Sequence, residues 1–406
     1  MFFYKVVATS SDSERFLVRI FNGEFSEANN GGLSKANPDS LSRFIMFFPP
    51  VVVADPAPVL VLPDSCRPWF FDVSPAPKFS NDFSGVVFSA VSRLGSGAEG
   101  VVDEGFYLSP TTPIKQHAAL KTRRRVSSSD ELSLYEKLNG VGGKSNLRPR
   151  RADARRVLME VASCDSHAFF YHPCFKALEE SLRFALRGVF CLDVCHGILE
   201  LLNCGYAHND LKGPNVLLTS LGYFKLTDHG LTRPLGSHYD YIRGTPEFKA
   251  PELLLQGIIG PTSDLFSLGA VLFQLIAGKS YLSFDPSDEI KAGLADVKLG
   301  KGYRHLDRAL CSYYRTPWPL KRVALLRGYS HSPLLCLALN LLHPDSSGRP
   351  SVLETMTTLA SILEKHDPQT LRSKLSELAQ LIDSSAVADS VPPPPGSPRQ
   401  KRTKLA

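Results

Sequence analysis

Residues 208–230 constrain this chain more than any other stretch. The segment reads His-Asn-Asp-Leu-Lys-Gly-Pro-Asn and continues through two short apolar runs, separated by a glycine turn, to Asp-His-Gly. Asp210 is followed by Lys212 and Asn215, and the second apolar run ends at Asp228. Phosphoryl transfer from ATP requires a carboxylate facing the attacking hydroxyl, and an amide and a second carboxylate that hold divalent metal on the phosphates. A single Asp or Asn here would usually be a loop cap, but the ordered set predicts a phosphotransfer site.

A glycine-rich segment lies upstream of this stretch. Residues 86–94 are β-prone and lead into Gly-Ser-Gly-Ala-Glu-Gly, after which the sequence again has strand-like composition. Dinucleotide-binding folds share these glycines but follow them with a helix. A strand, a glycine turn and a second strand instead favour a loop whose backbone amides cover nucleotide phosphates. The residues expected to line a nucleotide here are Gly95, Ser96, Gly97, Ala98, Glu99, Gly100 and Val102.

The order of the motifs resembles that of the protein kinases over about residues 86–365. Residues 208–230 are similar to the catalytic loop, hairpin and metal-binding turn of that family. Residues 243–252 read Arg-Gly-Thr-Pro-Glu-Phe-Lys-Ala-Pro-Glu and resemble its activation segment. The resemblance implies an α+β fold of two lobes, a small β-rich lobe at about 86–172 and a large helical lobe at about 176–365.

The resemblance also implies a role for each residue of the central motif. Asp210 would be the catalytic base of an ATP-dependent serine/threonine protein kinase, and Asn215 and Asp228 would hold Mg²⁺ or Mn²⁺ on the ATP. Lys212 favours serine/threonine over tyrosine specificity. Thr245 resembles the threonine that serine/threonine kinases place beside the catalytic Asp. A small-molecule phosphotransferase has no need of the activation segment, so the expected substrates are protein hydroxyls.

Lys121 ends an apolar strand that also carries Ala119, and both follow the glycine segment. They resemble the third strand of the small lobe, whose lysine binds the α- and β-phosphates. The lysine needs a carboxylate on the next helix. Glu131 fits the family pattern best, but its spacing from Lys121 is short, so Glu136 stays an alternative.

Three charged residues are expected to serve the fold rather than the chemistry. Asp264 begins an apolar run, residues 264–278, that resembles the central helix of the large lobe, where the carboxylate would brace the catalytic loop. Arg349 lies where the family keeps an arginine paired with the glutamate of Ala-Pro-Glu, here Glu252. Buried charges persist when they are paired or multiply hydrogen-bonded.

Secondary structure between the lobes is harder to assign from the sequence. Residues 157–162 and 168–171 have the composition of the last small-lobe strands. Apolar periodicity predicts helices over 176–186 and 189–202. The hinge that joins the two lobes is expected within residues 169–177.

Composition limits the class of protein. The chain of 406 residues is 43% hydrophobic and 21% charged, with a net charge of +6 that is too modest to indicate nucleic-acid binding. Its eight cysteines include no Cys-x-x-Cys pair, which indicates reduced thiols rather than a zinc ribbon. The N-terminus has no signal-peptide pattern, so secretion is not expected. Residues 44–63 are apolar but contain five prolines, which argues against a membrane helix.

The segments outside the predicted kinase domain are less informative. Residues 1–85 are expected to be a partly flexible extension, and an added strand or two on the small lobe is the alternative. In residues 366–406 a leucine-rich stripe predicts a last helix that packs on the large lobe, and residues 384 onward are expected to be disordered. The stripe comprises Leu371, Leu375, Leu378 and Ile382. Residues 398–405 form a basic cluster that fits a nuclear localisation signal or, as the alternative, a soluble tail. Residues 144–156 are also basic. They are expected to form a solvated loop, and a docking site for an acidic partner is the alternative.

Two substitutions depart from the usual kinase motifs. Asn209 stands where an arginine normally precedes the catalytic Asp, and His229 stands where a phenylalanine normally follows the metal-binding Asp. With these changes and the basic tail, the chain looks like the conserved herpesvirus serine/threonine-protein kinases, gammaherpesvirus branch. That resemblance implies a kinase of the host nucleus and cytoplasm, present in the virion tegument, that modifies host and viral proteins at Ser/Thr-Pro sites.

A pseudokinase scaffold and a small-molecule phosphotransferase are the two alternative functions. A pseudokinase scaffold would usually have lost the lysine, the catalytic Asp or the metal-binding Asp, but Lys121, Asp210 and Asp228 are all present. A nucleoside or antibiotic phosphotransferase would share the catalytic and metal residues without residues 244–252. The intact set favours an active protein kinase.

Overall fold

The computed structural model describes most of the chain in two compact units, residues 1–59 and residues 60–406. The described residues are 5–7, 17–19, 25–27, 59–70, 79–96, 100–110, 112–124, 129–140, 145–147, 149–238, 244–284, 287–315 and 332–390. The first unit contains a three-stranded antiparallel sheet of β1 (Lys5–Val7), β2 (Leu17–Arg19) and β3 (Phe25–Glu27).

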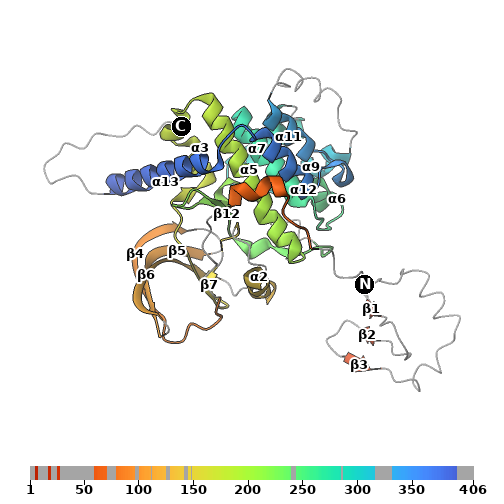
Figure 1. Cartoon of the computed structure of the whole chain (residues 1–406). Helices are drawn as coiled ribbons and strands as arrows, with labels where there is room; N and C mark the ends of the chain where they lie inside the picture. The colour runs from red at the N-terminus through yellow and green to blue at the C-terminus, as the bar shows by residue number, and fades with distance from the viewer. Residues whose placement is uncertain are drawn as a thin grey trace. The chain divides into compact units, whose positions relative to one another are not determined.

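The small lobe of the second unit is a five-stranded antiparallel sheet in the order β4-β5-β6-β8-β7. Its strands are β4 (Val87–Ser96), β5 (Gly100–Ser109), β6 (Thr112–Arg123), β7 (Pro149–Ala152) and β8 (Arg156–Met159). Helix α2 (Ser129–Gly140) accompanies the sheet in Figure 1. Leu134, Leu138 and Tyr135 of this helix are buried, because the helix has a continuous apolar face.

The chain passes from the small to the large lobe earlier than predicted. β9 (Cys164–Asp165) already pairs with β11 (Val216–Leu218) of the large lobe. The strand predicted at residues 168–171 is wrong, because α3 (Ser166–Tyr171) occupies this stretch. Asp165 explains the helix: its side chain accepts a hydrogen bond from the Ala168 amide at 2.8 Å and caps the first turn. The connection between the lobes is therefore the segment 160–163.

The large lobe is built around two buried helices, α5 (Glu180–Asn203) and α7 (Ser263–Ala277). The two helices predicted over 176–186 and 189–202 are mostly one, since α5 runs through Gly188 without a break. A Cβ at Gly188 would lie 2.9 Å from Leu363, so the glycine allows close packing rather than a turn. The other helices are α4 (Pro173–Lys176), α6 (Pro251–Leu255), α8 (Asp288–Lys298), α9 (Arg304–Arg315), α11 (Pro333–Leu341), α12 (Val352–Ile362) and α13 (Pro368–Ser390).

Short strands bring the functional loops together at the edge of this lobe. β11 and β12 (Phe224–Leu226) form an antiparallel hairpin. β10 (Tyr206–Ala207) pairs with β13 (Arg233–Pro234). A small sheet of one lobe facing a helical lobe confirms the predicted α+β, bilobal fold (Figure 1).

Both flanks of the predicted kinase domain contribute to the large-lobe core. The stripe on α13 is buried as predicted: Leu371, Leu375, Leu378 and Ile382 are at most 7% exposed. The helix continues to Ser390, so the prediction of disorder from residue 384 onward is wrong for residues 384–390. Alanines in this stretch favour a helix. Upstream, η2 (Asp64–Phe70) buries Cys66 and Trp69 in the same core, so this part of the predicted extension packs on the large lobe.

The basic segment 144–156 makes internal contacts where the structure describes it. Arg150 donates to Gln116 Oε1 at 2.7 Å. Arg156 pairs with Asp153 at 2.6 Å and lies 4.2 Å from the ring centre of Phe83. These two arginines therefore contact other parts of the small lobe.

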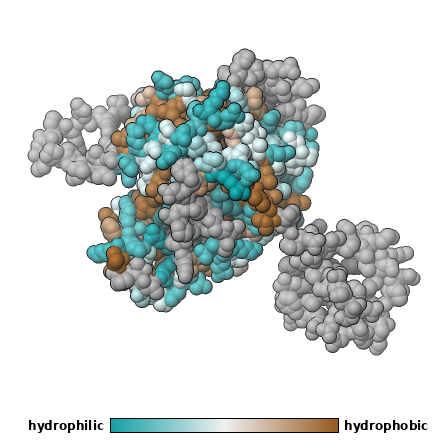
Figure 2. Space-filling view, viewed as in Figure 1, coloured by the Kyte–Doolittle hydropathy of each residue, from teal (hydrophilic) through white to brown (hydrophobic). Residues whose placement is uncertain are grey.

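The outer surface gives no sign of a membrane span. Within the described ranges, no helix combines the length and the apolar character that crossing a bilayer requires. The face in Figure 2 mixes hydrophilic and hydrophobic residues.

Candidate active site

The catalytic loop holds the Asp210 carboxylate between three side chains. Lys212 Nζ donates to Asp210 Oδ2 at 2.8 Å, and Asn215 Nδ2 donates to the same oxygen at 2.9 Å. Thr245, from the activation segment, donates to Asp210 Oδ1 at 3.4 Å and accepts from Lys212 Nζ at 3.1 Å. The structure therefore brings together the four residues to which the sequence assigned catalysis and serine/threonine specificity.

A buried carboxylate fixes the backbone of this loop. Asp264, 2% exposed at the start of α7, accepts hydrogen bonds from the amides of His208 at 2.6 Å and Asn209 at 2.9 Å. Burial raises the pKa of Asp264, and the two backbone hydrogen bonds act in the opposite direction. The bracing role predicted for Asp264 is confirmed. Such a carboxylate holds the loop rigid where catalysis needs fixed geometry.

His208 links the catalytic loop to the strand that carries Asp228. Its Nε2 lies 2.8 Å from the Thr227 carbonyl, and its Nδ1 lies 3.3 Å from the Asp210 amide. A carbonyl only accepts and an amide only donates, so these partners fit a neutral ring with the proton on Nε2. The backbones on either side of the site are thereby tied to one imidazole.

The Asn209 side chain is buried and hydrogen-bonded to backbone carbonyls. It is 4% exposed and has a φ of 65°, a left-handed conformation that asparagine tolerates better than most residues. Its Nδ2 donates to the carbonyls of Ala207 at 2.9 Å and Leu231 at 3.2 Å. The side chain thus joins the catalytic loop to the start of the activation segment without a phosphate.

Lys121 and Asp228 bring the two lobes into contact at the site. Lys121 lies on β6 opposite Val102 of β5, and its Nζ lies 2.6 Å from Asp228 Oδ1. Asp228 follows β12 with a φ of 64°, which turns the chain sharply after the strand. The ion pair is partly buried, with side chains 14% and 32% exposed. Both residues therefore lie where the sequence resemblance expects nucleotide and metal.

The structure distinguishes the two glutamates on α2. Glu131 is 3% exposed, whereas Glu136 is exposed. Glu131 Oε1 forms an ion pair with Arg123 and accepts a hydrogen bond from the Tyr135 hydroxyl at 2.6 Å. Burial, followed by the nearby Glu131 carboxylate, raises the pKa of Tyr135 well above its usual value. Arg123 lies two residues beyond Lys121 on β6, and its contact with Glu131 was not anticipated from the sequence.

His229 occupies an apolar environment between the lobes. Its ring meets Tyr135 edge-on at 5.9 Å and lies 5.3 Å from the ring of His208. The side chain is 1% exposed, and its Nε2 has no hydrogen-bond partner among the described residues. Burial holds the pKa of His229 well below its ordinary value. The ring is therefore neutral at ordinary pH.

The glycine segment is described on both sides of its tip. Gly95 pairs with Val102 and Ser96 with Val101 across the β4–β5 hairpin. A Cβ at Gly100 would lie 2.3 Å from the Thr122 carbonyl oxygen, so only glycine fits this approach of β5 to β6. The predicted nucleotide residues Gly97, Ala98 and Glu99 lie outside the described residues.

An apolar cluster adjoins Lys121. Ala119 lies in one buried cluster with Met159, and Val102, Val161 and Leu217 pack against it; Ala119 and Val102 were predicted from the sequence. Val161 comes from the connection between the lobes and Leu217 from β11. The sequence analysis missed these two, since neither belongs to a motif and only the fold brings them near the glycine segment.

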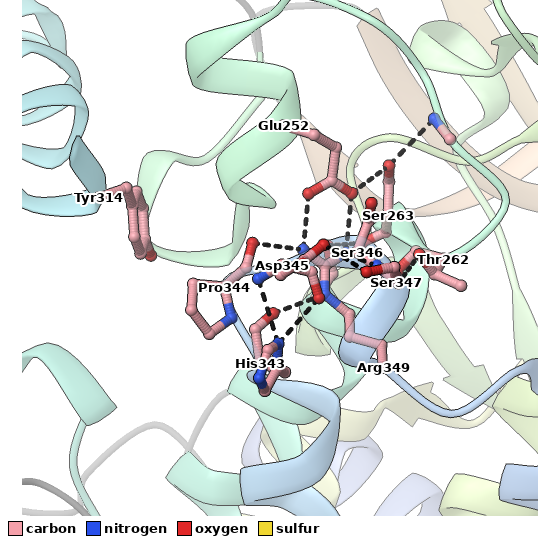
Figure 3. A network of polar contacts seen from close by, with 12 residues as sticks. Glu252, Thr262, Ser263, Tyr314, His343, Pro344, Asp345, Ser346, Ser347 and Arg349 are labelled. Carbon is pink, nitrogen blue, oxygen red and sulfur yellow. Dashed lines mark hydrogen bonds and ion pairs between the residues drawn. The ribbon is translucent and has the colours of Figure 1, made fainter. Parts of the chain in front are cut away.

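The activation segment ends in a buried ion pair, drawn in Figure 3. Arg349 donates to both oxygens of Glu252, at 2.7 Å and 2.6 Å. Ser263 donates to Glu252 Oε1 at 2.7 Å, and Arg349 also donates to the carbonyls of Thr262 and His343 at 3.1 Å and 2.7 Å. The predicted pairing of Arg349 with Glu252 is confirmed. A buried pair with its remaining donors satisfied in this way fixes the end of the segment.

A second buried pair in this region was missed by sequence reasoning. Lys249 Nζ lies 3.1 Å from Asp307 Oδ1 on α9, with side chains 2% and 10% exposed. Burial lowers the pKa of Lys249, and the Asp307 carboxylate opposes that shift. The contact spans 58 residues of chain, so no local pattern marks it.

The donor atoms fit a nucleotide with a hard divalent cation. Asn215 uses Nδ2 toward Asp210, which leaves its Oδ1 as the atom free to ligate. Asp228 supplies a partly exposed carboxylate. Carboxylate and amide oxygens are ligands that Mg²⁺ and Mn²⁺ prefer.

Comparison with known proteins agrees with this geometry. The protein kinase domain family matches residues 88–359, about two thirds of the chain. Cytokinesis protein sepH of Emericella nidulans is 38% identical over 103 residues, which cover 25% of this chain and 8% of sepH. Death-associated protein kinase dapk-1 of Caenorhabditis elegans is 26% identical over 192 residues, 46% of this chain and 13% of the relative.

A third relative spans more of the chain. The G-type lectin S-receptor-like serine/threonine-protein kinase At4g03230 of Arabidopsis thaliana is 27% identical over 298 residues, 68% of this chain and 32% of the relative. The chain thus covers less than half the length of each of these three relatives. The family match includes both lobes, the catalytic loop and the activation segment. This chain therefore belongs to the protein kinase domain family.

Proposed function

We propose that the protein is an active serine/threonine protein kinase that transfers the γ-phosphate of ATP to protein hydroxyls. The observation that carries this proposal is the set of contacts around Asp210, in which Lys212, Asn215 and Thr245 all meet its carboxylate. The relative named as a serine/threonine-protein kinase supports the same class of reaction.

Asp210 is the proposed catalytic base. It would accept the proton of the attacking hydroxyl as the new oxygen–phosphorus bond forms. Lys212, held at 2.8 Å from Asp210, would offset negative charge that develops on the transferred group. Hydrogen bonds from Lys212 and Asn215 fix the carboxylate, so that one geometry is presented to the substrate.

The nucleotide would be held from both lobes. Bound ATP with Mg²⁺ or Mn²⁺ supplies the phosphoryl group and the positive charge that neutralises it. Asn215 and Asp228 would ligate the metal, and Lys121 would orient the phosphates. The amides of the glycine segment would cover the phosphates, and the apolar cluster around Val102 and Ala119 would contact the base.

A protein substrate is favoured over a small molecule by the activation segment. Thr245 reaches Asp210, while seven residues later Glu252 is fixed by Arg349. The stretch between them includes the buried pair of Lys249 with Asp307. A rigid segment that starts at the catalytic carboxylate suits the docking of an extended peptide.

The proposal is tested by incubating the purified chain with labelled ATP and Mg²⁺ and three acceptors in parallel: a basic protein, a nucleoside mixture, or none. We expect label on serine and threonine of the basic protein and a loss of that label in Asp210→Asn. Label on the nucleosides alone would indicate a small-molecule phosphotransferase. No transfer, with nucleotide binding intact, would indicate a pseudokinase.

We also propose membership of the herpesvirus branch, with sites of action in the host nucleus and cytoplasm and in the virion tegument. Support comes from the sequence: Asn209, His229 and the basic residues 398–405. Fusing residues 391–406 to a fluorescent protein tests the nuclear part. We expect nuclear accumulation that is lost when Lys401, Arg402 and Lys404 are replaced by Ala, whereas equal distribution of both fusions would contradict it.

A further inference from the structure

Arg372 on α13 makes several side-chain contacts away from the catalytic loop. It lies beyond the residues that match the kinase family and is 4% exposed. Its guanidinium donates to both oxygens of Asp193 on α5, at 2.6 Å and 2.5 Å. It also donates to the carbonyls of Gly222 and Trp69, both at 3.0 Å. The ring of Tyr223 lies 4.1 Å from the guanidinium carbon.

These contacts converge on the closed end of the β11–β12 hairpin. Gly222 and Tyr223 lie in its turn, and Asp193 accepts a hydrogen bond from the Phe224 amide at 2.9 Å. Asp193 therefore bridges the guanidinium and the first residue of β12. A Cβ at Gly222 would lie 2.4 Å from the Arg372 carbonyl oxygen, which shows how closely the turn approaches α13.

The open end of the same hairpin carries the proposed metal ligands. Asn215 immediately precedes β11, and Asp228 follows β12 by two residues. Each strand has only three residues, and β9, the third strand of this sheet, pairs only two residues with β11. A sheet this small needs packing against neighbouring elements to be stable. The hairpin thus depends on what surrounds it, and at its turn the surroundings are α13 and α5.

We propose that Arg372 is a positioning residue for phosphoryl transfer. It holds the hairpin turn against α13 and α5, and thereby sets the spacing of Asn215 and Asp228 at the other end. This role rests on the proposed kinase function. A misplacement of about 1 Å at reacting groups lowers a rate by roughly a hundredfold. Arg372 is thus expected to affect the chemistry without touching nucleotide or substrate.

The same guanidinium joins the two flanks of the kinase domain. Its contact with the Trp69 carbonyl ties η2 to α13. Ser376, one turn further along α13, donates to the Ser220 carbonyl in the hairpin turn at 2.6 Å. We call Trp69, Arg372, Asp193 and this turn the rear clasp. The clasp contains segments from both sides of the family match.

The test compares Arg372→Met with two other variants in the full chain. Arg372→Met leaves Asp193 buried without its cation, which destabilises the fold strongly. The double variant Arg372→Met/Asp193→Asn removes that charge and keeps an acceptor for the Phe224 amide. Met356→Ala, on α12, is the control, because it creates a core cavity without altering a side chain of the clasp. Three quantities are measured: kcat, the Mg²⁺ concentration for half-maximal rate, and the hydrogen-exchange rate of the Phe224 amide.

We expect both Arg372 variants to lower kcat about tenfold to a hundredfold. We also expect them to raise the Mg²⁺ requirement and to speed exchange at Phe224. Met356→Ala should lower the melting temperature but change kcat, the Mg²⁺ requirement and the exchange rate at Phe224 only slightly. If the double variant matches the control in all three, Arg372 only neutralises Asp193 and the proposal is wrong.

The outcome is separable from the proposed function. If the wild-type chain transfers no phosphate, the kinase proposal fails, yet exchange at Phe224 still reports whether Arg372 holds the hairpin. Faster exchange without altered Mg²⁺ dependence in an active enzyme would overturn the positioning role.

Discussion

Lys121 offers the most direct residue-scale test of nucleotide placement. Its ammonium lies 2.6 Å from Asp228, and the charge would orient phosphates rather than stabilise the fold. We predict that Lys121→Met lowers the transfer rate at least a hundredfold and leaves the melting temperature within a few degrees. The pair is partly exposed, and such pairs contribute about 0–1 kcal/mol to stability. A near wild-type rate would show that β6 does not carry the nucleotide lysine.

His229 gives a second prediction at this scale. Its buried Nε2 has no partner among the described residues, whereas its Nδ1 lies 3.3 Å from Thr232 Oγ1. His229→Phe removes the unsatisfied Nε2, which costs about 1–3 kcal/mol while it is buried, and also removes the longer contact with Thr232. We expect the variant to be at least as stable as wild type at pH 7.5, with transfer activity retained. A variant less stable than wild type would mean that the imidazole has a role in the fold.

The same variant tests a pH dependence. Burial depresses the pKa of folded His229 below its ordinary value of 6.5, so below that pH the unfolded chain binds a proton that the folded chain does not. Protonation at this position therefore leaves the free energy of unfolding unchanged above about pH 6.5 and lowers it as the pH falls below that value. Denaturant unfolding between pH 7.5 and 5.0 should show a shallower loss in His229→Phe. Equal slopes in both proteins would contradict the assignment.

Residues with fixed spacing were predictable from the sequence, and residues paired across the fold were not. Asp210 and Asp228 stand in an ordered local motif, so the chemistry could be inferred before the structure. Arg372 pairs with Asp193 across 179 residues, and nothing local marks either one as buried. Tertiary pairing of this kind becomes visible only when the elements are placed in space.

At the scale of elements, the activation segment begins in an ordered backbone ladder. The Leu235 amide donates to the Gly205 carbonyl and the Gly236 amide to the Ile259 carbonyl, both at 2.9 Å. The Arg233 side chain, a possible receptor for a phosphate in this segment, donates to the carbonyls of Gly230 and Thr232, at 3.1 Å and 2.7 Å. With Asn209 also bound to carbonyls, the described part of the segment is held by bonds that need no phosphorylation.

We therefore predict that the kinase is active as synthesised. Purified enzyme would be treated with phosphatase until Ser237, Tyr239, Tyr241 and Thr245 are shown to be bare, and its rate on a peptide measured. We expect less than a tenfold change, because a charge-assisted bond from an arginine before Asp210 is absent and a neutral amide bond is about half as strong. A drop of a hundredfold or more would reveal another phosphate receptor. Tyr239, Tyr241 and Arg243 lie outside the described residues.

The elements that were mispredicted share a physical cause. A short apolar run such as residues 168–171 fits a strand or a helix equally well, and the cap at Asp165 decided the outcome. Gly188 falls between the two helices that apolar periodicity predicts, but it lies against Leu363 within α5. Longer periodic stretches, such as α7 and the stripe on α13, were predicted well because their burial pattern repeats over several turns.

For the whole molecule, the folded unit extends beyond the residues that match the kinase family. Four apolar residues of α13 are buried against the large lobe, each contributing roughly 1.5–3 kcal/mol. We predict that a chain ending at Asp367 loses most of its stability or becomes insoluble. The measurement is the free energy of unfolding and the soluble yield against the full chain. An unchanged free energy of unfolding would mean that α13 does not stabilise the large lobe.

The central claim is that this arrangement of Asp210, Lys212, Asn215 and Thr245 catalyses phosphoryl transfer to protein. The most direct measurement is the single-turnover rate of transfer from saturating Mg²⁺-ATP to a serine peptide, for wild type and Asp210→Asn. Nucleotide affinity and melting temperature are measured on the same preparations. A positioned base contributes roughly 10²–10⁴-fold to a rate. We predict a loss of that size in Asp210→Asn with nucleotide affinity and melting temperature little changed, whereas equal rates in the two proteins would contradict the account.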